Sequence, residues 1–80
     1  MMSAFVFVQV QGLASWADVV KMHKALHAVP GVKTVHFVAG PTDVIVYLEA
    51  ADQNALTETV GKLHGVKGVG STDTRIVLPS

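Results

Sequence analysis

Cysteine is absent from the 80 residues of this chain, and neither sign of charge prevails. Without cysteine there is no disulfide framework and no thiolate chemistry, which suits a reducing compartment. Six basic residues balance six acidic ones, so the composition lacks the excess of positive charge that neutralises nucleic-acid phosphates. The chain also lacks the charged start of a signal peptide and any apolar run near the roughly 20 residues that span a bilayer. These absences predict a soluble, cytoplasmic protein that binds neither DNA nor a membrane directly.

Apolar side chains, by contrast, are abundant. Half of the residues are hydrophobic and only 15% are charged, whereas a domain of this size buries only about 60% of its unfolded surface. A core this small cannot hide so many apolar side chains, and a lone monomer would be marginally stable. We therefore expect a single domain, residues 1–80, that associates with copies of itself.

One short segment occurs twice. Residues 26–32 read LHAVPGV, and residues 63–69, which lie 37 positions later, read LHGVKGV. In both copies a leucine from an apolar helix stripe is followed by a valine, a glycine and a second valine that opens a strand. A repeat of this length holds one strand, one helix and a turn. The chain is therefore expected to fold as two βαβ halves packed on each other.

The residue pattern predicts six elements. Strands are expected over residues 4–11, 32–39, 44–50 and 72–78, and helices over residues 15–28 and 52–64. Each helix begins at a residue that can cap it, Ser15 or Asp52, and residues 40–43 have the composition of a tight turn between two strands. The order βαββαβ with right-handed crossovers predicts an α+β fold, the ferredoxin-like plait, in which a four-stranded antiparallel sheet carries both helices on one face.

Alternation along the strands divides this sheet into two unlike faces. Aliphatic residues of the first and third strands point toward the helices: Val6, Val8, Val10, Val44, Val46 and Leu48. Larger side chains of the same strands point the other way: Phe5, Phe7, Ile45 and Tyr47. No predicted element covers this helix-free face, so we expect a second copy to pack on it, sheet against sheet, with these four residues in the dimer interface. The alternative is a solvated face with a few stray apolar side chains.

The first helix carries two stripes. The stripe expected to face the sheet is Val19, Met22, Leu26 and Val29. The second stripe, about 90° to one side, is Trp16, Val20, His23 and His27. It is either a second subunit contact or an ordinary flank whose amphipathic side chains keep one edge wet. His23 and His27 have the spacing of two zinc ligands but no certain third ligand, so we predict no metal site and no cofactor.

Catalytic motifs are missing as well. The acidic residues are scattered, no hydroxyl has a base and an orienting acid in motif spacing, and there is no glycine-rich phosphate loop. We therefore predict that the chain is not an enzyme. Asp43 can hydrogen-bond the backbone of its own turn. Beside the N–H groups of that turn, it can instead help to hold a zwitterion through both charged ends.

Three motifs resemble the ligand-binding module of the leucine-responsive/asparagine regulator (Lrp/AsnC) family. They are the Pro-Gly-Val turn at 30–32, the Gly-x-x-Asp hairpin at 40–43 and the Thr-x-Thr-x-Ile-Val-Leu strand at 72–78. The resemblance implies the same fold, dimers paired through their sheets, rings of such dimers, and amino-acid effectors bound between subunits. Gly40, Thr42 and Asp43 of one subunit would then form one wall of the effector site, and Thr72 and Thr74 of another subunit would form the second wall.

In those regulators a DNA-binding helix-turn-helix precedes the module, and this sequence has none, so operator binding is not implied. We expect a stand-alone regulatory module that binds an amino acid or a similar small metabolite. It would act by changing its assembly state, or by forming mixed oligomers with full-length regulators of the family. One alternative is a small dimeric α/β-barrel enzyme of the monooxygenase or isomerase type, which needs a roomy pocket between sheet and helices. Another is a purely structural oligomerisation unit.

Overall fold

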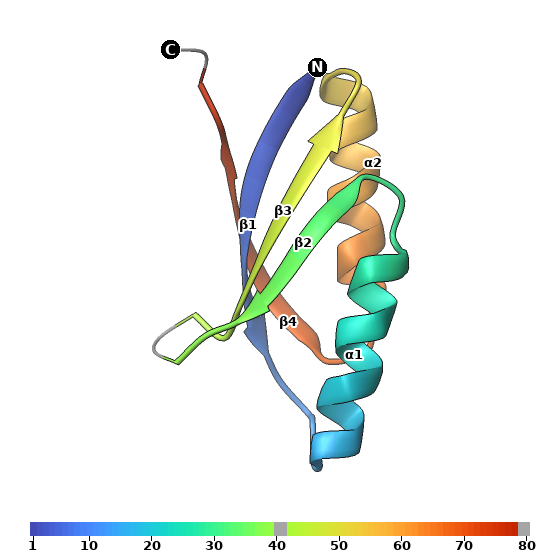
Figure 1. Ribbon diagram of the computed structural model, residues 1–80, viewed down its shortest axis with the longest axis vertical. Coiled ribbons are helices and arrows are strands. Elements are labelled where there is room, and N and C mark those ends of the chain that lie inside the picture. The colour runs from blue at the N-terminus through green and yellow to red at the C-terminus, as the bar shows by residue number, and fades with distance from the viewer. Residues whose placement is uncertain (40–41, 79–80) are drawn as a thin grey trace.

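The structure, a computed structural model, describes residues 1–39 and 42–78. Its elements are β1 (Met2–Val10), α1 (Trp16–Ala28), β2 (Val32–Phe37), β3 (Val44–Ala50), α2 (Gln53–His64) and β4 (Val69–Ile76). The strands form one antiparallel sheet in the order β2-β3-β1-β4, and both helices cover the same face of it (Figure 1). The predicted ferredoxin-like plait is therefore confirmed. Neither helix in the described part of the chain is long and apolar enough to cross a membrane.

Strand boundaries differ from those expected. β4 begins at Val69 instead of at position 72, because its antiparallel pairing with β1 continues through Ser71 to Val69. Gly70 and Ser71 have little intrinsic preference for strands, so pairing with a neighbouring strand outweighs their local propensity. β2 ends at Phe37, two residues before the expected end, where its pairing with β3 stops.

Side-chain caps determine where the helices begin. Ser15 Oγ accepts a hydrogen bond of 3.3 Å from the Asp18 N–H, and Asp52 Oδ1 accepts one of 2.9 Å from the Ala55 N–H. Each bond satisfies a backbone donor that has no partner inside its helix, a contribution of about 1 kcal/mol. Both predicted caps are confirmed.

The repeat places a glycine at the same point of each half, between helix and strand. Gly31 has φ of 97° and Gly68 has φ of 103°, values that side chains disfavour. A Cβ on Gly31 would lie 2.8 Å from the Glu49 carbonyl oxygen, and one on Gly68 would lie 2.7 Å from Leu13 Cδ2. Both turns therefore favour glycine for conformation, and at Gly31 the neighbouring backbone carbonyl also leaves no space for a Cβ.

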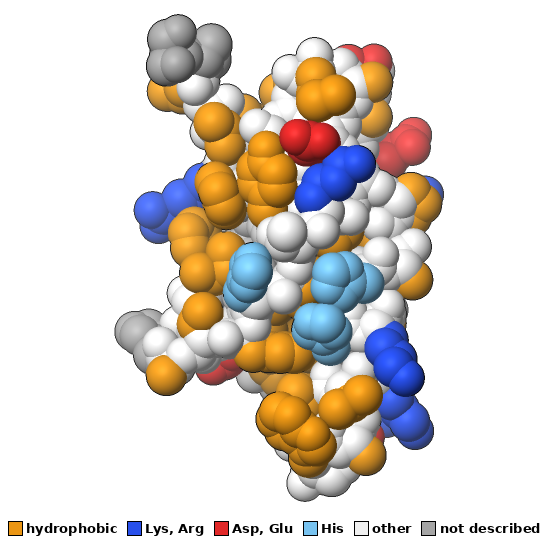
Figure 2. Space-filling view, viewed as in Figure 1, with side chains coloured by type: hydrophobic (Ala, Val, Ile, Leu, Met, Phe, Trp, Pro, Cys, Tyr) orange, Lys and Arg blue, Asp and Glu red, His pale blue; other side chains and the backbone are white. Residues whose placement is uncertain are grey.

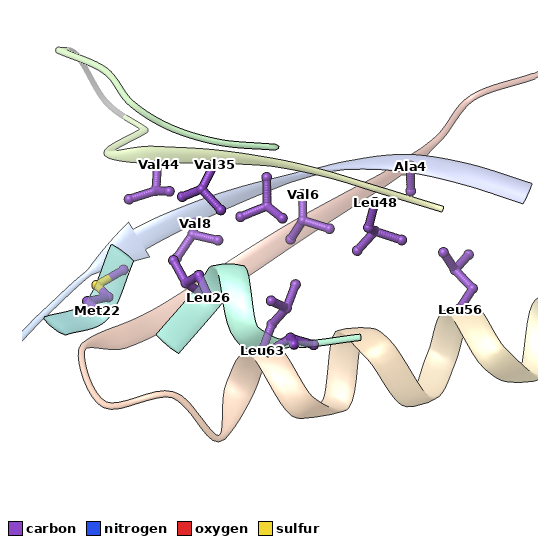
Figure 3. Close-up of a cluster of buried hydrophobic side chains, with 12 residues drawn as sticks. Ala4, Val6, Val8, Met22, Leu26, Val35, Val44, Leu48, Leu56 and Leu63 are labelled. Atoms are coloured by element: carbon purple, nitrogen blue, oxygen red, sulfur yellow. The ribbon is translucent and has the colours of Figure 1, made fainter. Parts of the chain in front are cut away.

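The core lies between the sheet and the two helices. In Figure 3, Val6, Leu48 and their neighbours project from the strands toward Leu26, Leu56 and Leu63 on the helices. The fully buried large side chains are Met22, Leu26, Leu48, Leu63, Val6, Val8, Val44 and Val46. Each such side chain contributes roughly 1.5–3 kcal/mol relative to an exposed one. These residues occupy the space that an enzyme of the dimeric α/β-barrel type would need for its pocket.

Candidate functional site

The helix-free face of the sheet has an apolar centre. Phe5 lies opposite Tyr47, and Phe7 lies opposite Ile45, across the β1–β3 pair. The rings of Phe5 and Tyr47 are in tilted contact, with centroids 5.0 Å apart. Phe5 is 41% exposed, and the other three side chains are half-buried. The structure thus brings the four residues predicted for a dimer interface into one continuous patch.

Charged groups border this patch. On the β4 side, the Arg75 guanidinium lies over the Phe7 ring, 5.0 Å from its centroid, and its Nη2 is 3.1 Å from Asp73 Oδ2. On the β3 side, the Tyr47 hydroxyl donates a 3.3 Å hydrogen bond to Glu49 Oε2. An apolar centre with a polar rim is the usual anatomy of a protein–protein interface.

Asp43 lies where the β2–β3 turn meets the end of β1. Its Oδ2 accepts a 2.9 Å hydrogen bond from the N–H of Val10, which is 33 residues away in sequence. Its own N–H donates to the Val8 carbonyl at 3.2 Å, and its carbonyl accepts from the Val38 N–H at 3.0 Å. Asp43 therefore ties the turn to β1. The sequence suggested a backbone partner within the turn, and the observed partner of the carboxylate is on another strand.

Asp43 also borders a hollow of about 360 Å³, which we call the Asp43 hollow. The other described residues that line it are apolar: Val10, Leu13, Trp16, Val19, Phe37 and Val38. Trp16 is 76% exposed, and Figure 2 shows hydrophobic side chains over the start of α1, at the lower end of the molecule. Sequence reasoning did not place Asp43 and Trp16 around one hollow, because residues 27 positions apart give no periodic signal.

A second hollow, the flank groove, continues past Trp16 along α1. It measures about 250 Å³ and is lined by Trp16, Val19, Val20, His23, Lys24 and Phe37. The His23 ring contacts that of His27 edge to face, with centroids 4.7 Å apart, and lies 5.4 Å from the Phe37 ring. Over residues 1–39 and 42–78, no cluster of three or more metal-ligating side chains forms.

The remaining predicted effector residues lie in different places. Thr72 Oγ1 is 2.7 Å from His64 Nε2 on α2, and Thr74 borders a hollow beside the same helix. Thr42 and Thr72 border a common hollow of about 280 Å³ with Phe7, Gln9, Ser71, Asp73 and Arg75. Gly40 lies outside the described residues. Asp43 is not brought next to Thr72 or Thr74 within one chain, and the prediction assigned these residues to different subunits.

Comparison with known sequences gives a family match and several partial relatives. The sequence model of one protein family, described as the Lrp/AsnC ligand binding domain, matches residues 3–80 of this chain. A segment of the homocitrate synthase of Sulfurisphaera tokodaii is 42% identical over 55 residues, and one in the homocitrate synthase of Saccharolobus solfataricus is 36% identical over the same length. These matches cover 69% of this chain but only 12% of each enzyme.

Solved structures share the fold over almost the whole chain. The transcriptional regulator NMB0573 from Neisseria meningitidis, solved with L-Met, has a TM-score of 0.84 at 22% identity and covers 98% of this chain and 50% of its own. AsnC from E. coli has a TM-score of 0.82 at 19% identity, over 99% of this chain and 52% of its own. FFRP-DM1 has a TM-score of 0.80 at 25% identity, over 98% of this chain and 100% of its own.

Proposed function

Because the chain belongs to the Lrp/AsnC family of ligand-binding domains, and is thus a ligand-binding regulatory domain, we propose that it assembles with copies of itself and binds an amino acid between subunits. The observation that carries this proposal is the position of Asp43, a half-buried carboxylate held at the hairpin turn beside an open hollow. The domain acts in the cytoplasm and has neither catalytic activity nor DNA affinity of its own.

The helix-free face supports the proposed assembly. Its apolar centre of Phe5, Phe7, Ile45 and Tyr47 alternates with the buried residues that face the helices, so a single chain leaves it partly in water. A second sheet packed about 10 Å away would remove this surface from water. The domain is small and has little stability to spare, so this added burial stabilises it. We propose a dimer formed in this way, and rings of such dimers.

The effector site takes one wall from each of two subunits. Asp43, with Gly40 and Thr42, receives the α-ammonium group of the amino acid through a charge-assisted hydrogen bond. Thr72 and Thr74 of another subunit supply hydroxyl groups for the carboxylate. The hydrogen bond from Val10 N–H already orients the Asp43 side chain. Less side-chain conformational entropy is therefore lost when a ligand binds.

The domain regulates by changing its assembly state, or by joining full-length regulators of its family in mixed oligomers. A second candidate role is control of an enzyme by a bound small molecule. The observation that favours it is the 42% identity to a segment that forms 12% of a homocitrate synthase. A ligand that bound between two such segments would couple metabolite concentration to the arrangement of the attached enzyme.

A thermal-shift screen with the twenty amino acids tests ligand binding, because a ligand that binds only the native state raises its melting temperature. Asp43→Asn then tests the site. The amide oxygen can still accept from Val10 N–H, while the negative charge is lost. We expect calorimetric titration to show affinity weaker by about 1.5–3 kcal/mol, with the oligomer intact by light scattering.

Glu58→Gln serves as the matched control, because it removes a carboxylate from an exposed position on α2 and should leave affinity unchanged. Equal affinities of wild type and Asp43→Asn would reduce Asp43 to a turn residue. A variant that dissociates before titration would show a structural role. If no amino acid raises the melting temperature, the proposed function is wrong.

A further inference from the structure

The Asp43 hollow pairs one charge with an apolar wall. Among the described residues that line it, Asp43 is the one charged side chain, and Trp16, Phe37 and Val38 are exposed enough to contact a bound molecule. Its volume of about 360 Å³ lies at the small end of the range of roughly 300–1,000 Å³ found for ligand pockets. The hollow therefore suits a small molecule with one positive end and an apolar body.

The lining also determines which side chain such a molecule can carry. An ammonium group paired with Asp43 leaves the rest of the ligand against Trp16, Phe37 and Val38. A charged group at the end of the side chain would lose hydration there without gaining a partner, which is unfavourable, whereas the α-carboxylate is directed to Thr72 and Thr74 of the other subunit. An aliphatic or aromatic side chain would instead remove its own surface and that of Trp16 from water.

The flank groove extends the apolar surface. It shares Trp16, Val19 and Phe37 with the Asp43 hollow and continues to Val20. A long side chain therefore has more wall to cover than a methyl group does. Lys24 also borders the flank groove, so an acidic side chain is the one charged type for which a counter-ion is near.

Building on the function proposed above, we propose that the effector is an amino acid with a large, uncharged, apolar side chain. Trp16 and Phe37 select that side chain, while Asp43 pairs with the α-ammonium group. This assignment also explains the second stripe of α1: the aromatic start of that helix is one wall of the effector pocket.

Norleucine and lysine provide a matched pair of probes, because their four-carbon side chains differ by a terminal ammonium group. We expect norleucine to bind about tenfold more tightly than lysine, since the second ammonium would lose part of its hydration against an apolar wall without gaining a partner. Glutamate tests the influence of Lys24 and is expected to bind more weakly than norleucine. Trp16 is the single tryptophan of the chain, so bound norleucine should shield its fluorescence from quenching by iodide.

Trp16→Ala should weaken norleucine binding about tenfold or more, as truncation of a central aromatic contact does. Because Trp16 is 76% exposed, the variant should keep the wild-type melting temperature without ligand. Leu78→Ala is the matched control, since it truncates a side chain that is 79% exposed and follows Val77, whose N–H donates to the Ser3 carbonyl near the start of β1. Its affinity for norleucine should equal that of wild type.

The outcomes separate this inference from the proposed function. If lysine or glutamate binds as tightly as norleucine, or if Trp16→Ala binds norleucine as wild type does, the inference is wrong and amino-acid binding stands. If bound norleucine leaves the quenching of Trp16 by iodide unchanged, Trp16 does not contact the ligand and the inference is also wrong. If no amino acid binds wild type at all, the proposed function fails first.

Discussion

Phe5 and Val6 are neighbours in β1, yet Val6 is fully buried beneath the helices and Phe5 is 41% exposed on the opposite face. The helix-covered face is aliphatic and closely packed, while the helix-free face is aromatic with charges at its margins. The same strands form both faces, so the difference comes from alternation alone. The comparison teaches that one face stabilises the fold of the single chain and the other is available for assembly.

Val6→Asp should have the largest effect. It places an unpaired carboxylate among fully buried aliphatic side chains, at a cost of at least about 4–5 kcal/mol. Since domains of this kind have a total stability of roughly 5–15 kcal/mol, we expect an unfolded chain by circular dichroism. A cooperative thermal transition near that of wild type would show that the helix-covered face does not stabilise the fold as described.

Replacing Phe5 and Phe7 together by aspartate makes the matched change on the other face. Here the charges are buried only if a partner sheet covers them, so the expected cost of about 2–4 kcal/mol falls on association. The variant should elute as a smaller species in size exclusion with light scattering. Elution as the native oligomer would disprove sheet-to-sheet packing.

Gly31→Ala probes how closely the backbone packs on the helix side. The added Cβ would lie 2.8 Å from a strand carbonyl, in a conformation with φ of 97°, and should reduce stability by about 2–3 kcal/mol in urea unfolding. Gly12→Ala is the control, because Gly12 also has positive φ, 72°, but its Cβ would meet nothing within 4 Å. Equal losses in the two variants would mean that backbone strain alone accounts for both.

The smallest signal is expected in an assay for DNA binding. The formal net charge is zero, so the composition lacks the excess of positive charge that drives DNA binding. We expect no shift of duplex DNA at micromolar protein and physiological salt in a gel assay. A salt-sensitive shift would show that basic side chains gather on one surface of the domain despite its zero net charge.

Much of the fold could be predicted because it depends on residues close together in the chain. Ser15 and Asp52 cap helices through N–H groups three residues away, and the glycines of the repeat mark turns that only glycine adopts readily. Alternation assigned Phe5 and Tyr47 to one face and Val6 and Val46 to the other without knowledge of strand order. Element order, caps and faces follow from such spacing.

The tertiary structure alone decided the rest, because pairing register joins residues that spacing does not relate. Val10 N–H meets Asp43 across 33 positions, and β4 starts at Val69 since β1 offers it a partner there. The sequence pointed to Asp43 as a turn residue and a candidate effector contact, and to Trp16 as part of a subunit contact or a helix flank. Both residues line one hollow only because α1 packs beside the β2–β3 hairpin. Periodicity in the sequence indicates the faces of single elements and does not predict contacts between separate elements.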